Sequence, residues 1–413
     1  MLAITSFVKH FIEIWEKSPV GLPQFEVKYA NEEQQEREKQ FVVFQQKMNA
    51  LKSVKKTESL RNGDPGKTFF PMFKAFLKNV FDFEQDQLEI ILSDKFKDVS
   101  KDFFYKARAF GPELSPENIY QGMRNVWIMN GIQLMMDIQV EITPSIFGYS
   151  MIYPYSDNFL DDPNISTFQK QQFSDRFSCR LHGQCEVPMN HTEQQLFKLV
   201  SMFEQQYPRA LFPKVYESLY AIQQGQTNSL KLMKTNTISD SQVKHIAFEK
   251  GGASVLADGY LVAGRLTEKQ EQALFGYGVY LQLLDDIQDI KEDLEADTCT
   301  MFSFPGGKKL NEFVNKTIHF GRAALEEMQC FEGAEMSTFL RLMNRSIETM
   351  IIESVGMNPA YYSDDYLKEL EKHSPIRFEF IRKRRSQSKS QRFSLFRKYF
   401  EQTKPEKVVL VED

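Results

Sequence analysis

The chain has 413 residues, 42% of them hydrophobic, so it can bury a sizeable core. Its formal net charge of −5 excludes a globally basic surface, and we expect no nucleic-acid partner. No apolar run is long enough to span a bilayer, and Lys9 and His10 interrupt the first hydrophobic stretch. The start of the chain therefore predicts an amphipathic helix and not a signal peptide, and we expect a cytoplasmic protein.

Three parts are expected along the chain. Residues 1–66 form an N-terminal helical and polar extension, in which 31–62 are mostly polar and charged. Residues 67–385 form a helical domain, because amphipathic segments at helical spacing follow one another there with short breaks. Residues 386–413 form a basic, flexible tail.

Capping signals mark several helix starts within the domain. Ser115 followed by Pro116 predicts a helix that runs to Ile142, and Thr143 followed by Pro144 predicts the next one. Thr267 with Gln270 three residues later is a capping-box pattern. Further helices are expected at 166–182, 192–206, 209–225 and 239–264, and two or three more cover 308–355 and 363–385. No segment alternates as a strand does, so the predicted fold class is all-α.

The most informative segment is the acidic run that ends at Asp293. Asp285, Asp289 and Asp293 are four residues apart, which places them on one face of a helix. Like charges at that spacing destabilise a helix unless a cation lies between them. The residues before the run, 276–284, are apolar or small. This combination indicates a divalent metal at the rim of an apolar cavity.

A second acidic group lies upstream, near the end of the helix that starts at Thr143. It comprises Asp157, Asp161 and Asp162, just before Pro163. Alone, such a group is usually a solvated helix end, although acids at a helix C-terminus oppose the helix dipole. Two acidic groups at the ends of two apolar helices favour a function. Ligands that are all carboxylates suit Mg²⁺ or Mn²⁺ and argue against zinc.

Such ions commonly share their coordination with substrate phosphates. Carboxylates on two facing helices could hold a small group of ions that bridge to a diphosphate and stabilise it as a leaving group. A carbocation would then remain in the dry pocket below.

At these two motifs the sequence resembles the class I isoprenoid synthases, which include prenyl-chain elongating enzymes, squalene and phytoene synthases and terpene cyclases. Tyr153–Asp162 and Phe248–Asp258 look most like the bacterial large terpene synthases, the tetraprenyl-β-curcumene synthase type. The resemblance spans roughly residues 100–380. The motifs match the family specifically, and the sequence between them matches only loosely. It implies a helical bundle around a central apolar cavity, with a cluster of three Mg²⁺ ions held by the six aspartates named above.

The motifs also depart from the family pattern. The first reads D-x-x-x-D-D, where elongating enzymes show D-D-x-x-D, and the second has Asp where many cyclases use Asn, Ser or Glu. Asp286 and Glu292 flank the second triad. Which of Asp161 and Asp162 binds metal, and which acid of the second run is idle, stays open.

Basic residues are expected to bind the diphosphate. Lys250, followed by Gly251 and Gly252, stands at an expected helix break where backbone N–H groups could face an anion. Arg377 lies where the resemblance implies an Arg-Tyr pair, with Phe378 in place of Tyr. Arg176 and Arg180 share a helix face after the first motif. Each of these cations, taken singly, could equally be a solvated helix residue.

Six residues on the faces that lead to the acids are candidates to line the prenyl cavity, with plain helix packing as the alternative. They are Ile146, Ser150, Tyr153, Leu274, Gly278 and Leu281. Small Gly278 would leave room in the cavity.

The C-terminal segment combines basic residues with interleaved phenylalanines, from Arg382 to Phe400. It predicts a solvated end, or alternatively peripheral contact with an anionic membrane surface. The sequence is compatible with a homodimer and leaves the oligomeric state open.

The predicted function is Mg²⁺-dependent ionisation of an allylic polyprenyl diphosphate, followed by carbocation cyclisation or rearrangement to a terpene. One alternative is a prenyltransferase that condenses two prenyl units on the same fold, although the expected Arg-Arg pair after the first motif is missing. A third is a non-catalytic helical binding protein. Substrate chain length and product skeleton stay open.

Overall fold

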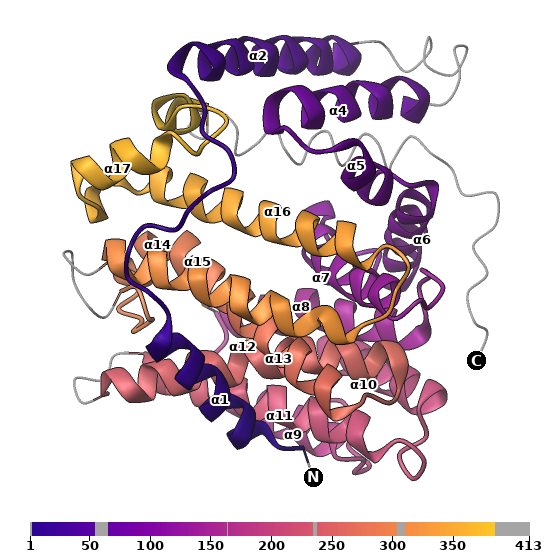
Figure 1. Ribbon diagram of the computed structural model, residues 1–413. Helices are drawn as coiled ribbons and strands as arrows, with labels where there is room; N and C mark the ends of the chain where they lie inside the picture. Colours follow the sequence, from indigo (N-terminus) through magenta and orange to yellow (C-terminus); the bar gives the residue numbers. More distant parts are fainter. Residues whose placement is uncertain (1, 54–64, 163, 234–237, 304–309, 385–413) are drawn as a thin grey trace.

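A computed structural model describes residues 2–53, 65–162, 164–233, 238–303 and 310–384, which form α-helices joined by loops (Figure 1). These ranges contain no strand, and one isolated bridge pairs Met233 with Thr298. The all-α prediction is confirmed. The basic tail expected at 386–413, and the membrane contact predicted for it, lie outside the described residues.

The helices are α1 (Ile4–Lys17), α2 (Asn31–Ser53), α4 (Pro65–Phe81), α5 (Gln85–Ile91), α6 (Asp94–Phe110), α7 (Pro116–Met135), α8 (Pro144–Asp161), α9 (Thr167–Leu181), α10 (His191–Gln206), α11 (Pro213–Ser229), α12 (Asp240–Ala263), α13 (Glu268–Gln288), α14 (Ile290–Glu295), α15 (Leu310–Glu327), α16 (Met336–Met357) and α17 (Asp364–Glu371).

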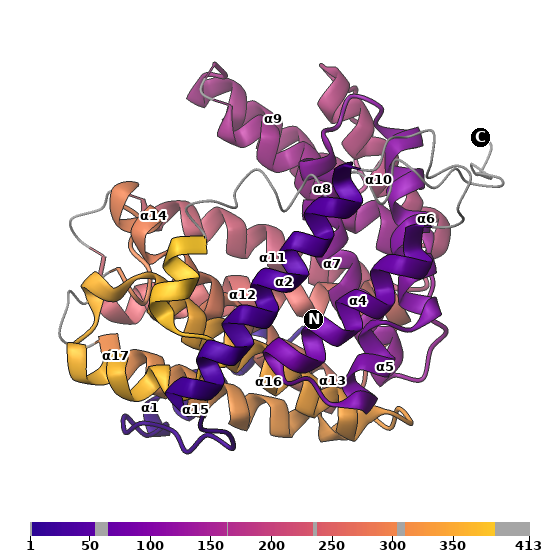
Figure 2. The ribbon, with the colours of Figure 1, turned by 90° about the horizontal axis from the view of Figure 1, so that it is seen from above.

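Helices α12 and α13 pack against each other in the middle of the molecule. Helix α12 also contacts α1, α7, α8 and α11, and α13 contacts α1, α15 and α16. Helices α2 and α4 lie together along one side (Figure 1), and α9 projects from the body in Figure 2. Within the described ranges, no helix is both long and apolar enough to span a bilayer.

Helix α1 belongs to the core of this bundle. Its residues Phe7, Phe11 and Trp15 are at most 4% exposed and pack with the hydrophobic residues of the domain. The start of the chain is therefore integral to the domain, and only the amphipathic character of that helix was evident from the sequence.

The three predicted helix starts are observed. The side chains of Ser115, Thr143 and Thr267 accept hydrogen bonds from backbone N–H groups in the first turns of α7, α8 and α13. Helix α7, however, ends at Met135 and not at Ile142. Asp137 adopts a left-handed φ of 53°, which stops the helix before the segment that precedes Pro144.

The helix break expected beside Lys250 is wrong, because α12 continues through Gly251 and Gly252. These glycines allow α12 and α13 to approach closely. A Cβ on Gly278 would lie 2.2 Å from the Gly251 carbonyl oxygen, and a Cβ on Gly252 would meet the Phe275 ring. The sequence signal of two adjacent glycines reflects helix–helix contact and not a turn.

Candidate functional site

The acidic run keeps its helical spacing in spite of a bend. Helix α13 ends at Gln288, Asp289 bends the chain, and α14 follows. The Asp289 N–H donates to the Asp285 carbonyl at 2.9 Å, and the Asp293 N–H donates to the Asp289 carbonyl at 2.8 Å. Asp285 and Asp289 are exposed and Asp293 is half-buried. The three predicted residues therefore follow one another at single-turn intervals.

Asp286 differs from its neighbours because it is buried. Its Oδ1 accepts a hydrogen bond from Gln282 Nε2 at 2.8 Å, while Oδ2 is buried and has no hydrogen-bond partner among the described residues. Burial raises the pKa of Asp286 to about 7; the charges of Asp285 and Asp293 add to this rise, and Lys250 opposes it.

The pKa of Asp293 is raised for similar reasons. Burial raises its pKa to about 6, the charge of Asp289 contributes further, and Thr300 and Lys250 act against the rise. The positive charge of Lys250 thus opposes the rise in pKa at both Asp286 and Asp293. Of the four predicted diphosphate ligands, Lys250 is the one whose charge acts on this acidic run.

The first acidic group lies at the end of α8. Asp157 Oδ2 accepts a hydrogen bond from Gln121 Nε2 of α7 at 2.6 Å. Asp162 is half-buried and accepts from the Asn164 backbone N–H at 2.8 Å. Asp161 is the last residue of α8, and its side chain lies outside what the structure describes.

A buried aspartate on α12 shows how α13 is oriented. Asp258 is 1% exposed, and its charge acts on Tyr153 of α8 and on Tyr277 of α13. Lys250, two helical turns away on α12, acts on the acids beyond the end of α13. Helix α13 therefore runs from the level of Asp258 towards the level of Lys250, and the acidic run follows at that end. On α8, Asp157 follows one turn after Tyr153.

Three side chains on packed helices are partly exposed near this end of the bundle. Between Gly251 and Val262, Ser254 is the one residue of α12 that is not buried, although the helix is surrounded by others. Tyr153 and Leu281 are likewise half-buried, on α8 and α13. The Tyr153 phenol contacts Ser254, and burial raises the pKa of Tyr153 even though part of its side chain is accessible.

The six candidate cavity residues separate into two kinds. Tyr153 and Leu281 are half-buried, whereas Ile146, Ser150 and Leu274 are fully buried. Leu274 fills the space above Gly259, and the space above Gly278 is taken by the α12 backbone. The expectation that Gly278 leaves room in a cavity is therefore corrected.

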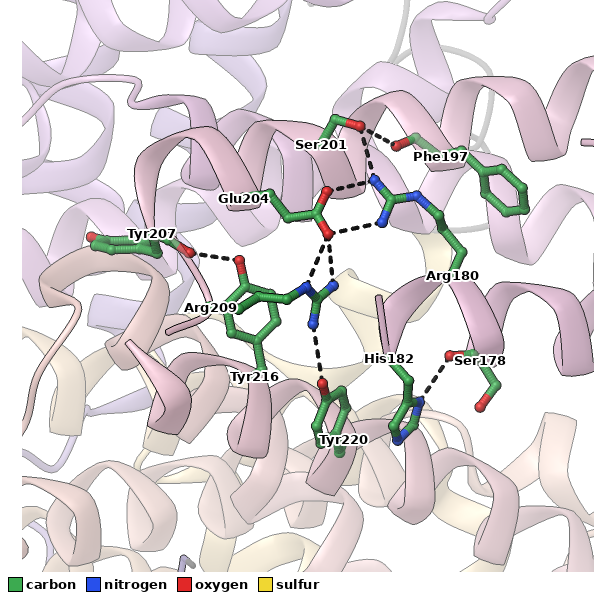
Figure 3. Close-up of polar contacts among 10 residues, drawn as sticks. All are labelled: Ser178, Arg180, His182, Phe197, Ser201, Glu204, Tyr207, Arg209, Tyr216 and Tyr220. Atoms are coloured by element: carbon green, nitrogen blue, oxygen red, sulfur yellow. Dashed lines mark hydrogen bonds and ion pairs between the residues drawn. The ribbon is translucent and has the colours of Figure 1, made fainter. Parts of the chain in front are cut away.

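Arg176 and Arg180 are engaged by carboxylates of α10. Arg176 forms a two-pronged ion pair with Glu193, which is fully buried. Arg180 donates to Glu204 at 2.9 and 2.6 Å and to Ser201 at 3.0 Å. Figure 3 shows Glu204 between the guanidinium groups of Arg180 and Arg209. Both predicted ligands thus join α9 to α10.

Arg377 is held by α2. Its Nε and backbone N–H donate to Glu38 Oε1 at 2.8 and 3.0 Å, and a terminal nitrogen donates to Oε2. It also lines a surface pocket with Lys28, Lys368 and Lys372. These contacts tie the chain after α17 to the N-terminal part of the molecule.

The donor chemistry of the acidic end fits a hard divalent cation. Its donors are carboxylate oxygens; burial, with a smaller contribution from their mutual repulsion, raises the pKa of Asp286 and Asp293, and one buried oxygen of Asp286 has no partner among the described residues. In the described part of the chain, no three His, Cys, Asp or Glu side chains converge as a ready-made metal site. Binding of an ion would therefore require these carboxylates to turn towards it.

Sequence reasoning overlooked the polar group around Asp258. Asn125 Nδ2 donates to Asp258 Oδ1 at 3.2 Å and lies 3.3 Å from Ser150 Oγ. The signal was available: Asp258 is an acid within an otherwise apolar stretch of α12, and Asn125 lies at helical spacing from Gln121. Neither residue belongs to a spacing pattern that points to a ligand.

No protein-family model matches the sequence, and no curated protein matches it significantly. Among solved structures, a geranyltransferase from Legionella pneumophila is similar with a TM-score of 0.40 and 12% identity, over 64% of this chain and 98% of the other. The geranylgeranyl pyrophosphate synthetase of the archaeon Geoglobus acetivorans has a TM-score of 0.34 and 14% sequence identity, and the match covers 71% of this chain and 98% of the other. A decaprenyl diphosphate synthase from Rhodobacter capsulatus has a TM-score of 0.32 and 12% sequence identity, and the match covers 73% of this chain and 99% of the other. Likeness at this level is too weak to assign a fold family or an activity.

Proposed function

We propose that this protein ionises a prenyl diphosphate in the presence of a divalent cation, as class I isoprenoid synthases do. The observation that carries the proposal is the acidic run after α13, in which the carboxyls of Asp286 and Asp293 feel the charge of Lys250 on α12. In this proposal the acids at the end of α8 join them. The half-buried residues Tyr153, Ser254 and Leu281 lie on the same three helices. A charged diphosphate at the acids and a hydrocarbon chain against the apolar side chains of these helices would match this division of polarity.

The residues have distinct tasks in this proposal. Asp157 of α8 and Asp285, Asp289 and Asp293 of the acidic run would hold Mg²⁺, with Lys250 as the protein cation nearest the diphosphate. When bound, the ions would neutralise the diphosphate and stabilise it as a leaving group. Tyr153 and Leu281 would exclude water from the allylic cation, and the phenol ring could stabilise it through its π face.

Two fates of the cation follow the same ionisation. Cyclisation to a terpene needs one substrate, and the engagement of Arg176 and Arg180 with Glu193 and Glu204 favours it, because neither arginine is available for a second diphosphate.

Condensation needs a second diphosphate site, and it is also the activity denoted by the names of the weakly similar synthases. Arg124 favours this second candidate. It is exposed on α7, one turn from Gln121.

The deciding experiment measures diphosphate release and organic products from C15, C20 and C25 allylic diphosphates with Mg²⁺, with and without isopentenyl diphosphate. Hydrocarbon or alcohol from one allylic substrate supports cyclisation, and longer diphosphates that form only with isopentenyl diphosphate support condensation. Absence of diphosphate release from every substrate would reject the enzyme and leave a helical binding protein.

Variants then test the residues. We expect Asp285→Ala and Asp157→Ala to lower diphosphate release by about 100-fold, the usual scale for loss of one charge-stabilising group. Asp240→Asn, on the exposed first turn of α12, is the matched control and should retain activity. Equal loss in the control, or full activity in both acid variants, would contradict the assignment.

A further inference from the structure

Amide side chains of α7 form a polar contact with α8, the helix that carries the first acidic group. Asn118, Gln121 and Asn125 recur at helical spacing along one face of α7. Each donates a hydrogen bond to a side chain of α8. The bonds run from Asn118 Nδ2 to Asn158 Oδ1 at 3.1 Å, from Gln121 Nε2 to Asp157 Oδ2 at 2.6 Å, and from Asn125 Nδ2 to Ser150 Oγ at 3.3 Å. The partners on α8 descend in number as those on α7 rise, so the two helices run antiparallel.

The end of α8 depends on this contact for its orientation. Pro154 lies inside α8 and has no N–H, so the Ser150 carbonyl does not receive the bond that the fourth residue along a helix normally donates. Gly122 of α7 packs at this carbonyl, because a Cβ on Gly122 would lie 2.7 Å from the Ser150 oxygen. The turns from Pro154 to Asp161 are therefore joined to the start of α8 by one hydrogen bond fewer, and α7 lies directly against the weakened point.

The bond from Gln121 acts on a carboxylate that the proposed function assigns to the metal. Gln121 and Asp157 are both half-buried. The Gln121 amide holds Oδ2 of Asp157, while the hydroxyl of the adjacent Ser156 lies 3.2 Å from Oδ1 and can rotate. Because an amide is neutral, this bond fixes one carboxylate oxygen without cancelling the negative charge that a cation requires.

The bond to α7 distinguishes Asp157 from the next described acid of its group. Asp162 accepts from the backbone N–H and Nδ2 of Asn164, two residues along the same loop, at 2.8 and 2.9 Å. A local bond of this kind moves with the loop. Gln121, in contrast, belongs to a helix whose next turn carries the fully buried Met123. Gln121 thus ties Asp157 to the core of the bundle.

We propose that Gln121 is a positioning residue for the divalent cation at the end of α8, which holds Oδ2 of Asp157 so that Oδ1 is presented to the ion. The inference rests on the proposed function, in which Asp157 binds the metal. Gln121 acts through Asp157 and touches neither the ion nor the substrate. Loss of a partner that orients a metal-binding side chain typically weakens metal binding by about 10- to 100-fold.

Mn²⁺ binding tests this role without turnover. The full chain is titrated with Mn²⁺ in the presence of inorganic diphosphate, and free Mn²⁺ is followed by electron paramagnetic resonance. The ions that Asp157→Asn loses are those that this carboxylate binds. In Gln121→Met, whose side chain has a similar length but no N–H, we expect the dissociation constant of these ions to rise about 10-fold.

A double variant shows whether the effect passes through Asp157. Added to Asp157→Asn, Gln121→Met should weaken Mn²⁺ binding no further, because no carboxylate remains to be positioned. Gln205→Met, the same exchange at an exposed position of α10, is the matched control and should bind Mn²⁺ as the wild type does. Gln121→Asn is one methylene shorter and keeps the amide, and it should also weaken binding; it replaces Gln121→Met if that variant does not fold.

The outcomes separate this inference from the proposed function. Unchanged Mn²⁺ affinity in the Gln121 variants, even with a lower melting temperature, would overturn the inference and leave ionisation intact, as would an equal further loss in the Asp157→Asn background. Failure of the wild type to bind Mn²⁺ with diphosphate would overturn both. Weaker Mn²⁺ binding in Gln121→Met, combined with no diphosphate release from any allylic substrate, would uphold the role of Gln121 and reject the enzyme.

Discussion

At the scale of single residues, the molecule contains two kinds of carboxyl that a sequence cannot tell apart. Asp286 and Asp258 are both buried, with an unpartnered oxygen each, whereas Asp285 and Asp289 are exposed on the acidic run. Helical spacing predicted the exposed set because it depends on the 3.6-residue period alone. Burial depends on neighbouring helices, and for that reason Asp258 was overlooked.

The buried state of Asp258 predicts a pH-dependent cost to stability. Its pKa is raised in the folded protein, so above the ordinary value of 3.8 folding must protonate a carboxyl that is ionised in the unfolded chain. This cost grows with pH until the folded-state pKa is passed. Asp258→Asn removes it, and we expect its gain in melting temperature over the wild type to be larger at pH 8 than at pH 5. Tyr149, Tyr153 and Tyr277, which face the carboxyl, stay neutral over that range. A gain that does not change with pH would mean that the carboxyl is ionised in the folded state.

The ion pair between Arg176 and Glu193 predicts a loss of stability when the arginine is replaced. Glu193 is fully buried and also accepts from the Met189 backbone N–H at 2.7 Å. Removal of the arginine leaves a buried charge unpaired, so we expect Arg176→Met to lower the free energy of unfolding by about 3 kcal/mol in urea titrations. Adding Glu193→Gln should recover part of that loss. If Arg176→Met unfolds as the wild type does, the arginine is available for a ligand after all.

Among the helices, the close packing of α12 against α13 sets the position of Lys250 relative to the acidic run. Capping residues predicted the starts of α7, α8 and α13, because a cap is a local interaction. The path of α12 was not predictable in the same way. Gly251 and Gly252 indicate a turn when considered locally, and only the contact with Gly278 shows that they serve helix packing.

This contact makes Gly278→Ala a sharp test of the packing. Its Cβ would lie 2.2 Å from the Gly251 carbonyl oxygen, and a backbone atom cannot rotate away. We expect the free energy of unfolding to fall by about 2 kcal/mol, even though alanine favours a helix more than glycine does. Gly21→Ala is the matched control, because nothing lies within 4 Å of the added Cβ, and it should be neutral. Equal stability of the two variants would show that α12 and α13 can separate without cost.

At the scale of the whole molecule, the first helix completes the core. The sequence suggested an N-terminal extension because the polar segment 31–62 separates the first helix from the rest. In the structure, Phe11 is fully buried, lies against Gly276 of α13, and packs with the rings of Phe275 and Phe320. A long-range contact of this kind leaves no local pattern, so composition alone does not reveal that α1 packs into the core.

Because α1 is part of the core, we expect a substitution on its buried face to destabilise the whole domain, including the acidic end. Phe11→Ala would leave a cavity between α1 and α13, and we expect a loss of about 3–5 kcal/mol in the free energy of unfolding, with the molecule unfolding as one cooperative unit. Lys9→Ala, on the exposed face of the same helix, should change it little. Urea unfolding followed by circular dichroism measures both. A separate extension would instead unfold in its own early transition and leave the midpoint of the main domain unchanged, and that outcome would contradict a core shared by α1, α12 and α13.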